Sequence, residues 1–239
     1  MCFWAGEVGH SVSDFEQSDA LVLREMAAPS TPLYKNGDVI MIERFYLIVG
    51  HVSQIELLVP HGVRLVQLRL KGLPETEVRR QITRARDFCA VHRARLVVNG
   101  HWKLALDLNC RYVHLGQESI DSTDFPALRR AGIEFGLSTH DELELERALS
   151  FDPAYIALGP IHLTLLKKKA AGLQGLAQIT RWKKKIGQMP LVAIGGITPE
   201  RLPGVFDAGA DSVAVLTDIQ CAQDPEAQTC KWLQATAVR

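Results

Sequence analysis

The stretch Leu191-Val192-Ala193-Ile194-Gly195-Gly196-Ile197-Thr198-Pro199-Glu200 is the starting point for predicting the fold. It begins as a short apolar run of β-forming residues and passes two glycines. A helix start follows, with Thr198 at the N-cap and Pro199 at the first helical position. A strand that ends in Gly-Gly before a helix directs backbone N–H groups at one point, which suits a phosphate. Gly195 and Gly196 are equally typical of a plain β–α turn, so both interpretations stay open here.

The charge balance and the cysteines narrow the class of protein. The 27 basic and 27 acidic residues give a formal net charge of zero, which does not indicate nucleic acid or an anionic membrane as partner. The five cysteines form no Cys-x-x-Cys pair, which favours reduced thiols over disulfides or a zinc site. No apolar run is long enough to cross a bilayer and the N-terminus has no signal-peptide pattern, so we expect a cytoplasmic protein.

Short apolar runs alternate with helical patterns from Phe45 onward. In the segment 75–92, for example, Val78, Ile82, Ala85 and Cys89 recur at three and four residues, on one helix face. The expected strands are Phe45–Val49, Arg64–Arg69, Leu96–Asn99, Tyr112–Leu115, Glu134–Ser138, Tyr155–Leu158, Leu191–Ile194 and Ser212–Thr217. The expected helices are Gln54–Val59, Glu75–His92, Trp102–Leu108, Phe125–Ala131, Asp141–Ala148, Leu176–Ile186, Glu200–Ala208 and Pro225–Leu233.

Eight strand–helix units predict an α/β protein with a closed (β/α)₈ TIM barrel. Continuous apolar strands separated by helices are typical of a parallel sheet that is covered on its outer face. A doubly wound open sheet is the alternative, but Gly50-His51-Val52 does not fit its Gly-x-Gly-x-x-Gly fingerprint. Residues 1–43 carry no motif, and we expect a loosely packed N-terminal extension before a barrel over residues 44–239.

Polar residues gather at the predicted carboxyl ends of the strands, where such barrels hold their chemistry. Hydrogen-bond donors and cations dominate, which suits a phosphorylated ligand. The candidate residues are Gln67, Arg69, Lys71, Asn99, Ser138, Thr139, His140, Thr164, Lys167, Gly195, Gly196 and Thr217.

Several of these residues also have a purely structural interpretation. Thr139-x-x-Glu142 is a capping box, so Ser138 and Thr139 are expected to cap a helix if they bind no ligand. Asn99 can bond to backbone in its own turn. His114 lies inside an apolar strand, which favours a hydrogen-bonded core histidine, whereas His140 stands at a strand end, where a base is useful.

Six motifs in the same order and spacing resemble the thiamine-phosphate synthase family, over about residues 45–233. The superfamily also contains thiazole tautomerases, which share the fold. The motifs are Gln67-x-Arg69-x-Lys71, Val98-Asn99, Val113-His114-Leu115-Gly116-Gln117-Glu118, Ser138-Thr139-His140, Gly159-Pro160-Ile161 with Thr164 and Lys167, and Ala193-Ile194-Gly195-Gly196-Ile197.

The resemblance implies a transferase of thiamine biosynthesis. It would couple an aminopyrimidine methyl diphosphate to a thiazole phosphate carboxylate, releasing diphosphate and then CO₂, with Mg²⁺ as cofactor. It implies three groups of site residues. Those expected to hold the pyrimidine diphosphate are Gln67, Arg69, Lys71 and Asn99. Those expected at the leaving diphosphate or the pyrimidine, as catalytic as well as binding residues, are Ser138 and Lys167. Those expected at the thiazole phosphate are Thr164, Gly196 and Thr217, and Gly195 is expected to bind substrate beside them.

This sequence departs from the family pattern at the magnesium ligands. Gly100 and Ser119 stand where the family has its two metal-binding Asp residues, and Leu166 replaces a Thr of the Lys167 loop. Glu118 is close in sequence but does not occupy a matching position. Mg²⁺ is therefore expected from the family, while its ligands are missing here.

Two further functions compete with the synthase reaction. Asn99-Gly100 and His140 are similar to the tautomerase branch, in which His140 would act as base without a metal. A non-catalytic phosphate-ligand-binding homologue is the third interpretation. The Gln67–Arg69–Lys71 set and Lys167 favour the synthase. Expected partners are phosphorylated small molecules, and Trp182 and Trp232 on outer helices leave room for a homo-oligomer.

Overall fold

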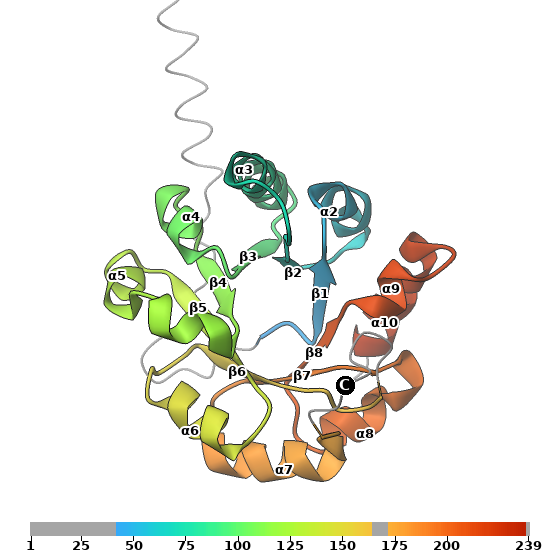
Figure 1. Ribbon diagram of the computed structural model, residues 1–239. Coiled ribbons are helices and arrows are strands. Elements are labelled where there is room, and N and C mark those ends of the chain that lie inside the picture. Colours follow the sequence, from blue (N-terminus) through green and yellow to red (C-terminus); the bar gives the residue numbers. More distant parts are fainter. Residues whose placement is uncertain (1–41, 164–171, 238–239) are drawn as a thin grey trace, which may run out of the picture. The chain divides into compact units, whose positions relative to one another are not determined.

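The computed structural model describes residues 42–163 and 172–237. Within them, eight parallel strands close into a barrel in chain order, as Figure 1 shows. Pairing of Phe45 with Val213 joins the first strand to the last. The predicted (β/α)₈ barrel is therefore confirmed. The strands are β1 (Phe45–Val49), β2 (Leu65–Leu68), β3 (Arg95–Asn99), β4 (Tyr112–Leu115), β5 (Glu134–Thr139), β6 (Tyr155–Leu158), β7 (Leu191–Ile194) and β8 (Ser212–Val215).

Helices surround the barrel and alternate with its strands (Figure 1). The α-helices of the described residues are α2 (Val52–Leu58), α3 (Glu75–Val91), α4 (Trp102–Asp107), α5 (Phe125–Arg130), α6 (Glu142–Leu149), α7 (Gly175–Ile186), α8 (Leu202–Asp207), α9 (Thr217–Gln220) and α10 (Pro225–Ala237). The short 3₁₀ helices are η1 (Val59–His61), η2 (Gln117–Ser122) and η3 (Pro199–Arg201). All eight predicted helices are present, although the one after β7 starts as η3. Thr198 occupies its N-cap position, but the Thr198 side chain makes no capping hydrogen bond.

Both faces of the sheet are buried, which explains why the strands are apolar throughout. In β1, Phe45, Leu47 and Val49 belong to the larger core cluster, which includes the helices. Tyr46 and Ile48 belong to a second cluster, whose other strand members also alternate with those of the first. The second cluster fills the inside of the barrel. Side chains near the carboxyl ends of the strands that share its face therefore point to the barrel mouth.

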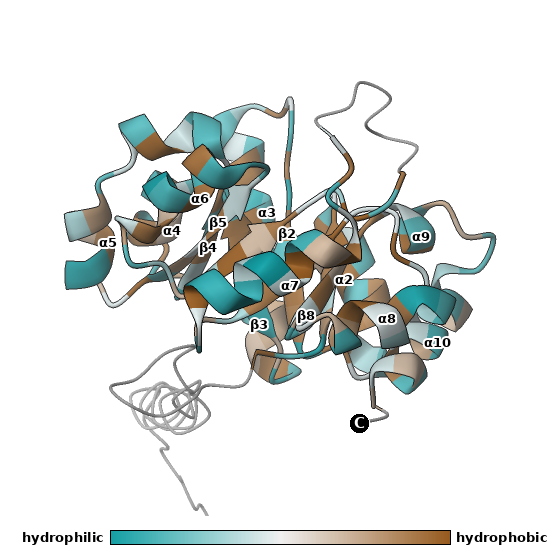
Figure 2. Ribbon diagram, turned by 90° about the horizontal axis from the view of Figure 1, so that it is seen from below, coloured by the Kyte–Doolittle hydropathy of each residue, from teal (hydrophilic) through white to brown (hydrophobic). Residues whose placement is uncertain are grey.

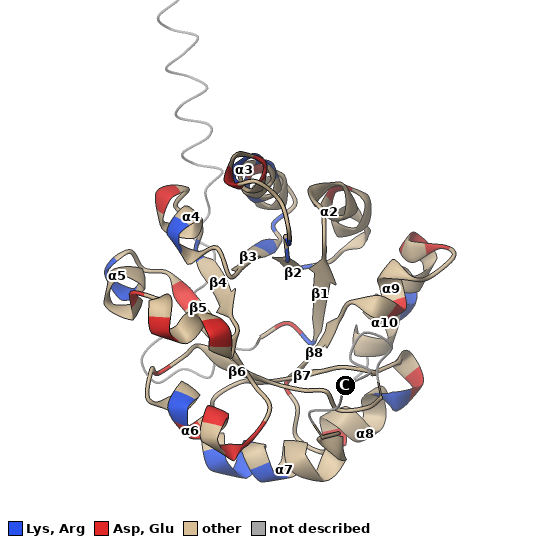
Figure 3. Ribbon diagram, viewed as in Figure 1, with Lys and Arg blue, Asp and Glu red and all other residues tan. Residues whose placement is uncertain are grey.

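The helices combine hydrophobic and hydrophilic residues, as Figure 2 shows for α7 and α8. Charged residues of both signs are spread over the outer helices (Figure 3). Trp182 on α7 and Trp232 on α10 are fully buried, and the Trp232 ring stacks on Phe45 with centroids 5.9 Å apart. Because the core covers both rings, these tryptophans do not support a homo-oligomer, which stays a prediction.

Two predictions fall wholly or partly on residues outside the described ranges. Nearly all of the N-terminal extension, 1–43, lies there, so the division into extension and barrel stays a prediction. Thr164 and Lys167 also lie outside the described residues. Among the described helices, none has the length and apolar character that a membrane span requires.

Candidate functional site

A cavity of about 890 Å³ opens at the carboxyl ends of the strands. Leu163, the last described residue before the gap that contains Lys167, also lines this cavity. The structure thus brings together every described residue that the sequence analysis assigned to substrate or catalysis. These residues are Gln67, Arg69, Lys71, Asn99, Ser138, His140, Gly195, Gly196 and Thr217.

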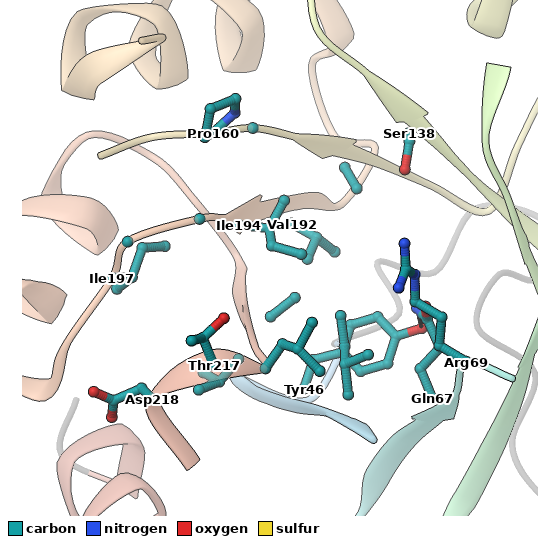
Figure 4. A pocket seen from close by; sticks show the side chains of 18 of the residues that line it. Tyr46, Gln67, Arg69, Ser138, Pro160, Val192, Ile194, Ile197, Thr217 and Asp218 are labelled. Carbon is teal, nitrogen blue, oxygen red and sulfur yellow. Dashed lines mark hydrogen bonds between the residues drawn. The ribbon is translucent and has the colours of Figure 1, made fainter. Parts of the chain in front are cut away.

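Arg69 supplies positive charge inside the mouth. Its backbone N–H donates to the carbonyl of Val49 at 2.8 Å, so the residue continues the pairing of β2 with β1 one step beyond the strand. Figure 4 shows the Arg69 guanidinium extending toward the same space as the Ser138 hydroxyl, with Thr217 at the other side of the view. Lys71, two residues later, also lines the cavity. A cationic wall opposite the β7–β8 side suits an anionic substrate.

The two glycines after β7 are in close contact with the loop after β6. The Ile161 N–H donates to the Ile194 carbonyl at 3.0 Å, and the His162 N–H donates to the Gly195 carbonyl at 2.9 Å. Gly196 has φ +62°, and a Cβ on it would lie 2.3 Å from the Leu163 carbonyl oxygen. Both the backbone angle and the space therefore require glycine here.

Arg201 is a cavity residue that sequence reasoning missed. It ends η3, and its guanidinium donates to the Gly196 carbonyl, so it stands directly beside the glycine pair. Arg201 follows Thr198 by three residues, so the two share one face of a helical turn. This spacing is the sequence signal that indicates a position beside the mouth. The glycine pair therefore has a cation next to it, which favours a phosphate site over a plain turn.

A chain of hydrogen bonds runs through the inside of the barrel and links six strands. Asn99 Nδ2 donates to Gln67 Oε1 at 3.1 Å, and Gln67 Nε2 donates to the Tyr46 hydroxyl at 2.8 Å. The Tyr46 and Tyr155 hydroxyls are 3.0 Å apart. The chain continues from the Tyr155 hydroxyl to His114 Nδ1 at 2.9 Å, and from His114 Nε2 to Ser138 Oγ at 2.8 Å.

His114 is the buried histidine that the sequence analysis predicted, with both ring nitrogens hydrogen-bonded. Burial lowers the pKa of His114 to about 4, and the positive charge of Arg69 acts in the same direction. The imidazole is therefore neutral at pH 7. Its ring stacks on Tyr155 with centroids 5.6 Å apart. His114 also lines the cavity, so it belongs to the core and to the site at once.

The helix cap after β5 differs from the prediction. Thr139 is part of β5, is buried, and donates its hydroxyl to the Ala157 carbonyl at 2.9 Å. The cap of α6 is Asp141, whose side chain accepts from the Glu144 N–H at 2.9 Å. The capping role predicted for Thr139 is wrong, because the strand extends through this residue. The Ser138 hydroxyl is hydrogen-bonded to His114 instead, and Ser138 lines the cavity.

His140 is bound by Glu144. Its Nδ1 lies 2.8 Å from Glu144 Oε2, and its backbone N–H donates to the same oxygen at 2.7 Å. Both contacts fix the imidazole at the rim of the cavity. The role of His140 as a base stays a prediction.

The part of the mouth formed by β3 and β4 carries one carboxylate on the cavity wall, that of Glu118. Gly100 has φ +74° and open space around its α-carbon, and Ser119 lies in η2. Across the described residues, no three His, Cys, Asp or Glu side chains come together as a metal site would require. These residues do not fit the two-carboxylate magnesium site that the family resemblance implies.

Comparison with known proteins shows that this chain is similar to thiamine-phosphate synthases. A family model described as thiamine monophosphate synthase matches residues 45–219. The thiamine-phosphate synthase of Rhizobium etli is 51% identical over 196 residues, which cover 82% of this chain and 96% of that protein. The thiamine-phosphate synthase of Cronobacter sakazakii is 40% identical over 193 residues, covering 81% of this chain and 92% of that protein.

A solved structure supports the fold. The thiamine phosphate pyrophosphorylase of Pyrococcus furiosus superposes with a TM-score of 0.72 at 22% identity, covering 82% of this chain and 96% of that chain. The resemblance drawn from the six motifs is confirmed. Since the family model matches well over half of the residues and the relatives align over almost their whole length, the chain belongs to the thiamine monophosphate synthase family.

Proposed function

We propose that this chain is a transferase of thiamine biosynthesis that joins aminopyrimidine methyl diphosphate to thiazole phosphate carboxylate and releases diphosphate. Membership of the family and the 51% identity to a thiamine-phosphate synthase carry this proposal. The cavity supports it independently, because its volume and two cationic regions suit two phosphorylated small molecules.

The diphosphate substrate binds on the β2–β3 side. Arg69 and Lys71 face it with positive charge. The family resemblance assigns Lys167, which lies outside the described residues, to the same substrate. The amide of Gln67 is already bonded to Asn99 and Tyr46, so this residue acts mainly by holding its neighbours in place. Cations around the diphosphate lower the free energy of the transition state, in which the departing group gains negative charge.

The thiazole phosphate binds on the β7–β8 side. Gly195 and Gly196 provide backbone N–H groups without side chains, and Thr217 lines the same wall. Thr164 is assigned here by the family resemblance. Arg201 adds a cation to that set. Fixing both substrates in one cavity supplies the orientation that a two-substrate reaction needs.

The reaction that the family implies has three bond changes and a final protonation. The bond between the pyrimidine methyl carbon and diphosphate breaks, and its electron pair leaves with diphosphate. The thiazole nitrogen donates its lone pair to the resulting methyl cation. The carboxylate then leaves as CO₂, the electron pair of the broken carbon–carbon bond stays on the thiazole ring, and the ring takes up a proton from water. Arg69, Lys71 and Lys167 neutralise the leaving group, while Ser138 donates a hydrogen bond on the β5 side.

A pair of introduced carboxylates should improve magnesium use. We expect Gly100→Asp combined with Ser119→Asp to raise turnover and to lower the Mg²⁺ concentration for half-maximal rate, because it restores hard oxygen ligands. Gly100 has room for a side chain, and Asp is among the residues that tolerate positive φ. The control is Gly132→Asp, with φ +68° and equally open space, after α5. A magnesium titration that is unchanged in the double variant would contradict this prediction.

A side-by-side assay tests the proposed reaction. Purified protein should release diphosphate when given both substrates, and should not aromatise a non-aromatic thiazole tautomer. The tautomerase and the non-catalytic homologue are not favoured, because the compared relatives are thiamine-phosphate synthases. Aromatisation without diphosphate release, which His140→Asn abolishes, would replace the proposal with the tautomerase. Binding of thiazole phosphate without either reaction would replace it with the non-catalytic homologue.

The proposal also includes a cytoplasmic location. The free thiols of Cys89 and Cys110 are buried in the larger core cluster, which includes the helices, and this supports a reducing, cytoplasmic setting. Homo-oligomerisation stays a prediction, and its support no longer includes the tryptophans.

A further inference from the structure

The hydrogen-bond chain inside the barrel has a direction, because each phenol in it holds a single proton. Burial raises the pKa of Tyr46 and Tyr155 well above that of an exposed phenol, so both hydroxyls are protonated. A hydroxyl donates once and can accept from others. The side-chain amide of Gln67 donates to the Tyr46 oxygen. Tyr46 must therefore give its own proton to its other partner, Tyr155.

The same reasoning fixes the proton on His114. Since Tyr155 accepts from Tyr46, its proton goes to His114 Nδ1, at 2.9 Å. A ring nitrogen that accepts a hydrogen bond carries no proton. The neutral imidazole therefore carries its proton on Nε2, from which it donates to Ser138 Oγ at 2.8 Å. Ser138 accepts this bond, and its own proton stays available for an acceptor in the cavity.

We propose that Gln67, Tyr46, Tyr155 and His114 are positioning residues that together hold the Ser138 hydroxyl as a hydrogen-bond donor toward the substrate. Asn99 orients the first amide by donating to Gln67 Oε1. The proposed acceptor is an oxygen of the diphosphate or a ring nitrogen of the pyrimidine. The tautomer of His114 follows from the chain alone, whereas the use of Ser138 by the substrate rests on the proposed function.

The packing around Tyr155 fixes the position of its ring, on which the hydrogen-bond chain depends. Gly136 on β5 pairs with Tyr155 on β6, and a Cβ on Gly136 would lie 2.0 Å from the Tyr155 ring. Only a residue without a side chain leaves that ring its place. The ring is also held by stacking on His114 and by an edge contact with Tyr46. Tyr155 is thus fixed between its donor and its acceptor.

The side-chain ¹⁵N spectrum of the full-length protein tests the direction of the chain. Long-range ¹H–¹⁵N correlations distinguish an imidazole protonated on Nε2 from one protonated on Nδ1, and the His114 signals are assigned by their loss in His114→Asn. We expect the Nε2–H tautomer at pH 7. The Nδ1–H tautomer in the wild type would overturn the proposal.

Gln67→Glu should reverse the chain while it keeps every contact. An ionised carboxylate cannot donate, so Tyr46 would donate to it, Tyr155 would donate to Tyr46, and His114 Nδ1–H would donate to Tyr155. Spectra recorded up to pH 9 should show this change to Nδ1–H as the introduced carboxyl group ionises. The matched control is Tyr46→Phe, which leaves the bond from Tyr155 to His114 and should retain Nε2–H. An unchanged tautomer in Gln67→Glu at every pH would overturn the proposal.

Kinetics then connect the tautomer to the substrate. Ser138→Ala should lower kcat/KM about tenfold or more in the wild type, yet have little further effect in Gln67→Glu, where Ser138 no longer donates outward. An equal loss of kcat/KM in the wild type and in Gln67→Glu would show that the hydrogen-bond chain does not act through Ser138. If the protein released no diphosphate at all, the proposed function would fail while the tautomer measurement still decided the direction of the chain.

Discussion

Arg69→Ala is expected to weaken binding of the pyrimidine diphosphate by about 1.5–3 kcal/mol, the contribution of a hydrogen bond to a charged group. That free energy corresponds to a rise in Kd of roughly 10- to 150-fold. The reason is structural: the Arg69 side chain faces the cavity, near enough to His114 to lower its pKa. Isothermal titration with the diphosphate substrate measures the effect.

A control variant separates charge in the mouth from charge in general. Arg130→Ala removes an exposed arginine from the end of α5, outside the cavity lining, and should leave the affinity unchanged. Lys167→Ala should resemble Arg69→Ala if the assignment from the family motif is right. An unchanged Kd in Arg69→Ala would remove this residue from the diphosphate site.

Gly196→Ala is expected to cost both stability and phosphate binding. Any L-residue at a left-handed position loses about 1–2 kcal/mol. At Gly196 the new methyl would in addition lie 2.3 Å from the Leu163 carbonyl, and overpacking of this kind costs roughly 1–3 kcal/mol more. Because the loop must move away from the glycine pair, affinity for thiazole phosphate should fall as well. Urea denaturation and calorimetric titration measure the two effects separately.

Gly132→Ala is the matched control for this substitution. Gly132 has φ +68°, close to the φ +62° of Gly196, but nothing lies within 4 Å of a Cβ placed there. The control should show only the cost of the backbone angle and should bind thiazole phosphate normally. Equal losses of stability in both variants, with unchanged binding, would show that the contact with Leu163 has no role.

The barrel and most of the site could be predicted from sequence, because both depend on short-range patterns. Apolar strands alternate with amphipathic helices, and polar residues such as Arg69 and Asn99 follow the strands directly. The closed parallel barrel forces the carboxyl ends to meet, so residues far apart in the sequence share one cavity.

The remaining features depend on which face of a strand a residue occupies and on where a strand ends. Tyr46 and Tyr155 are typical core residues in an apolar run, and their bond to each other becomes visible only once β1 and β6 face one another. The pattern Thr139-x-x-Glu142 indicates a helix cap, but β5 extends one residue beyond the predicted strand and includes Thr139. Arg201 lies on η3, beyond the end of β7, so the pattern of polar residues at strand ends does not include it.

The inner wall on the side of β6 to β8 includes three small or medium aliphatic side chains, those of Ala157, Val192 and Ala214. Their side chains carry no polar atoms, so exchanging them for other apolar residues removes no donor or acceptor from the mouth. These three positions are therefore suited to substitutions that let the enzyme accept larger or smaller substrate analogues. Changes in shape there would alter the space next to the proposed thiazole phosphate site without removing a polar group from it.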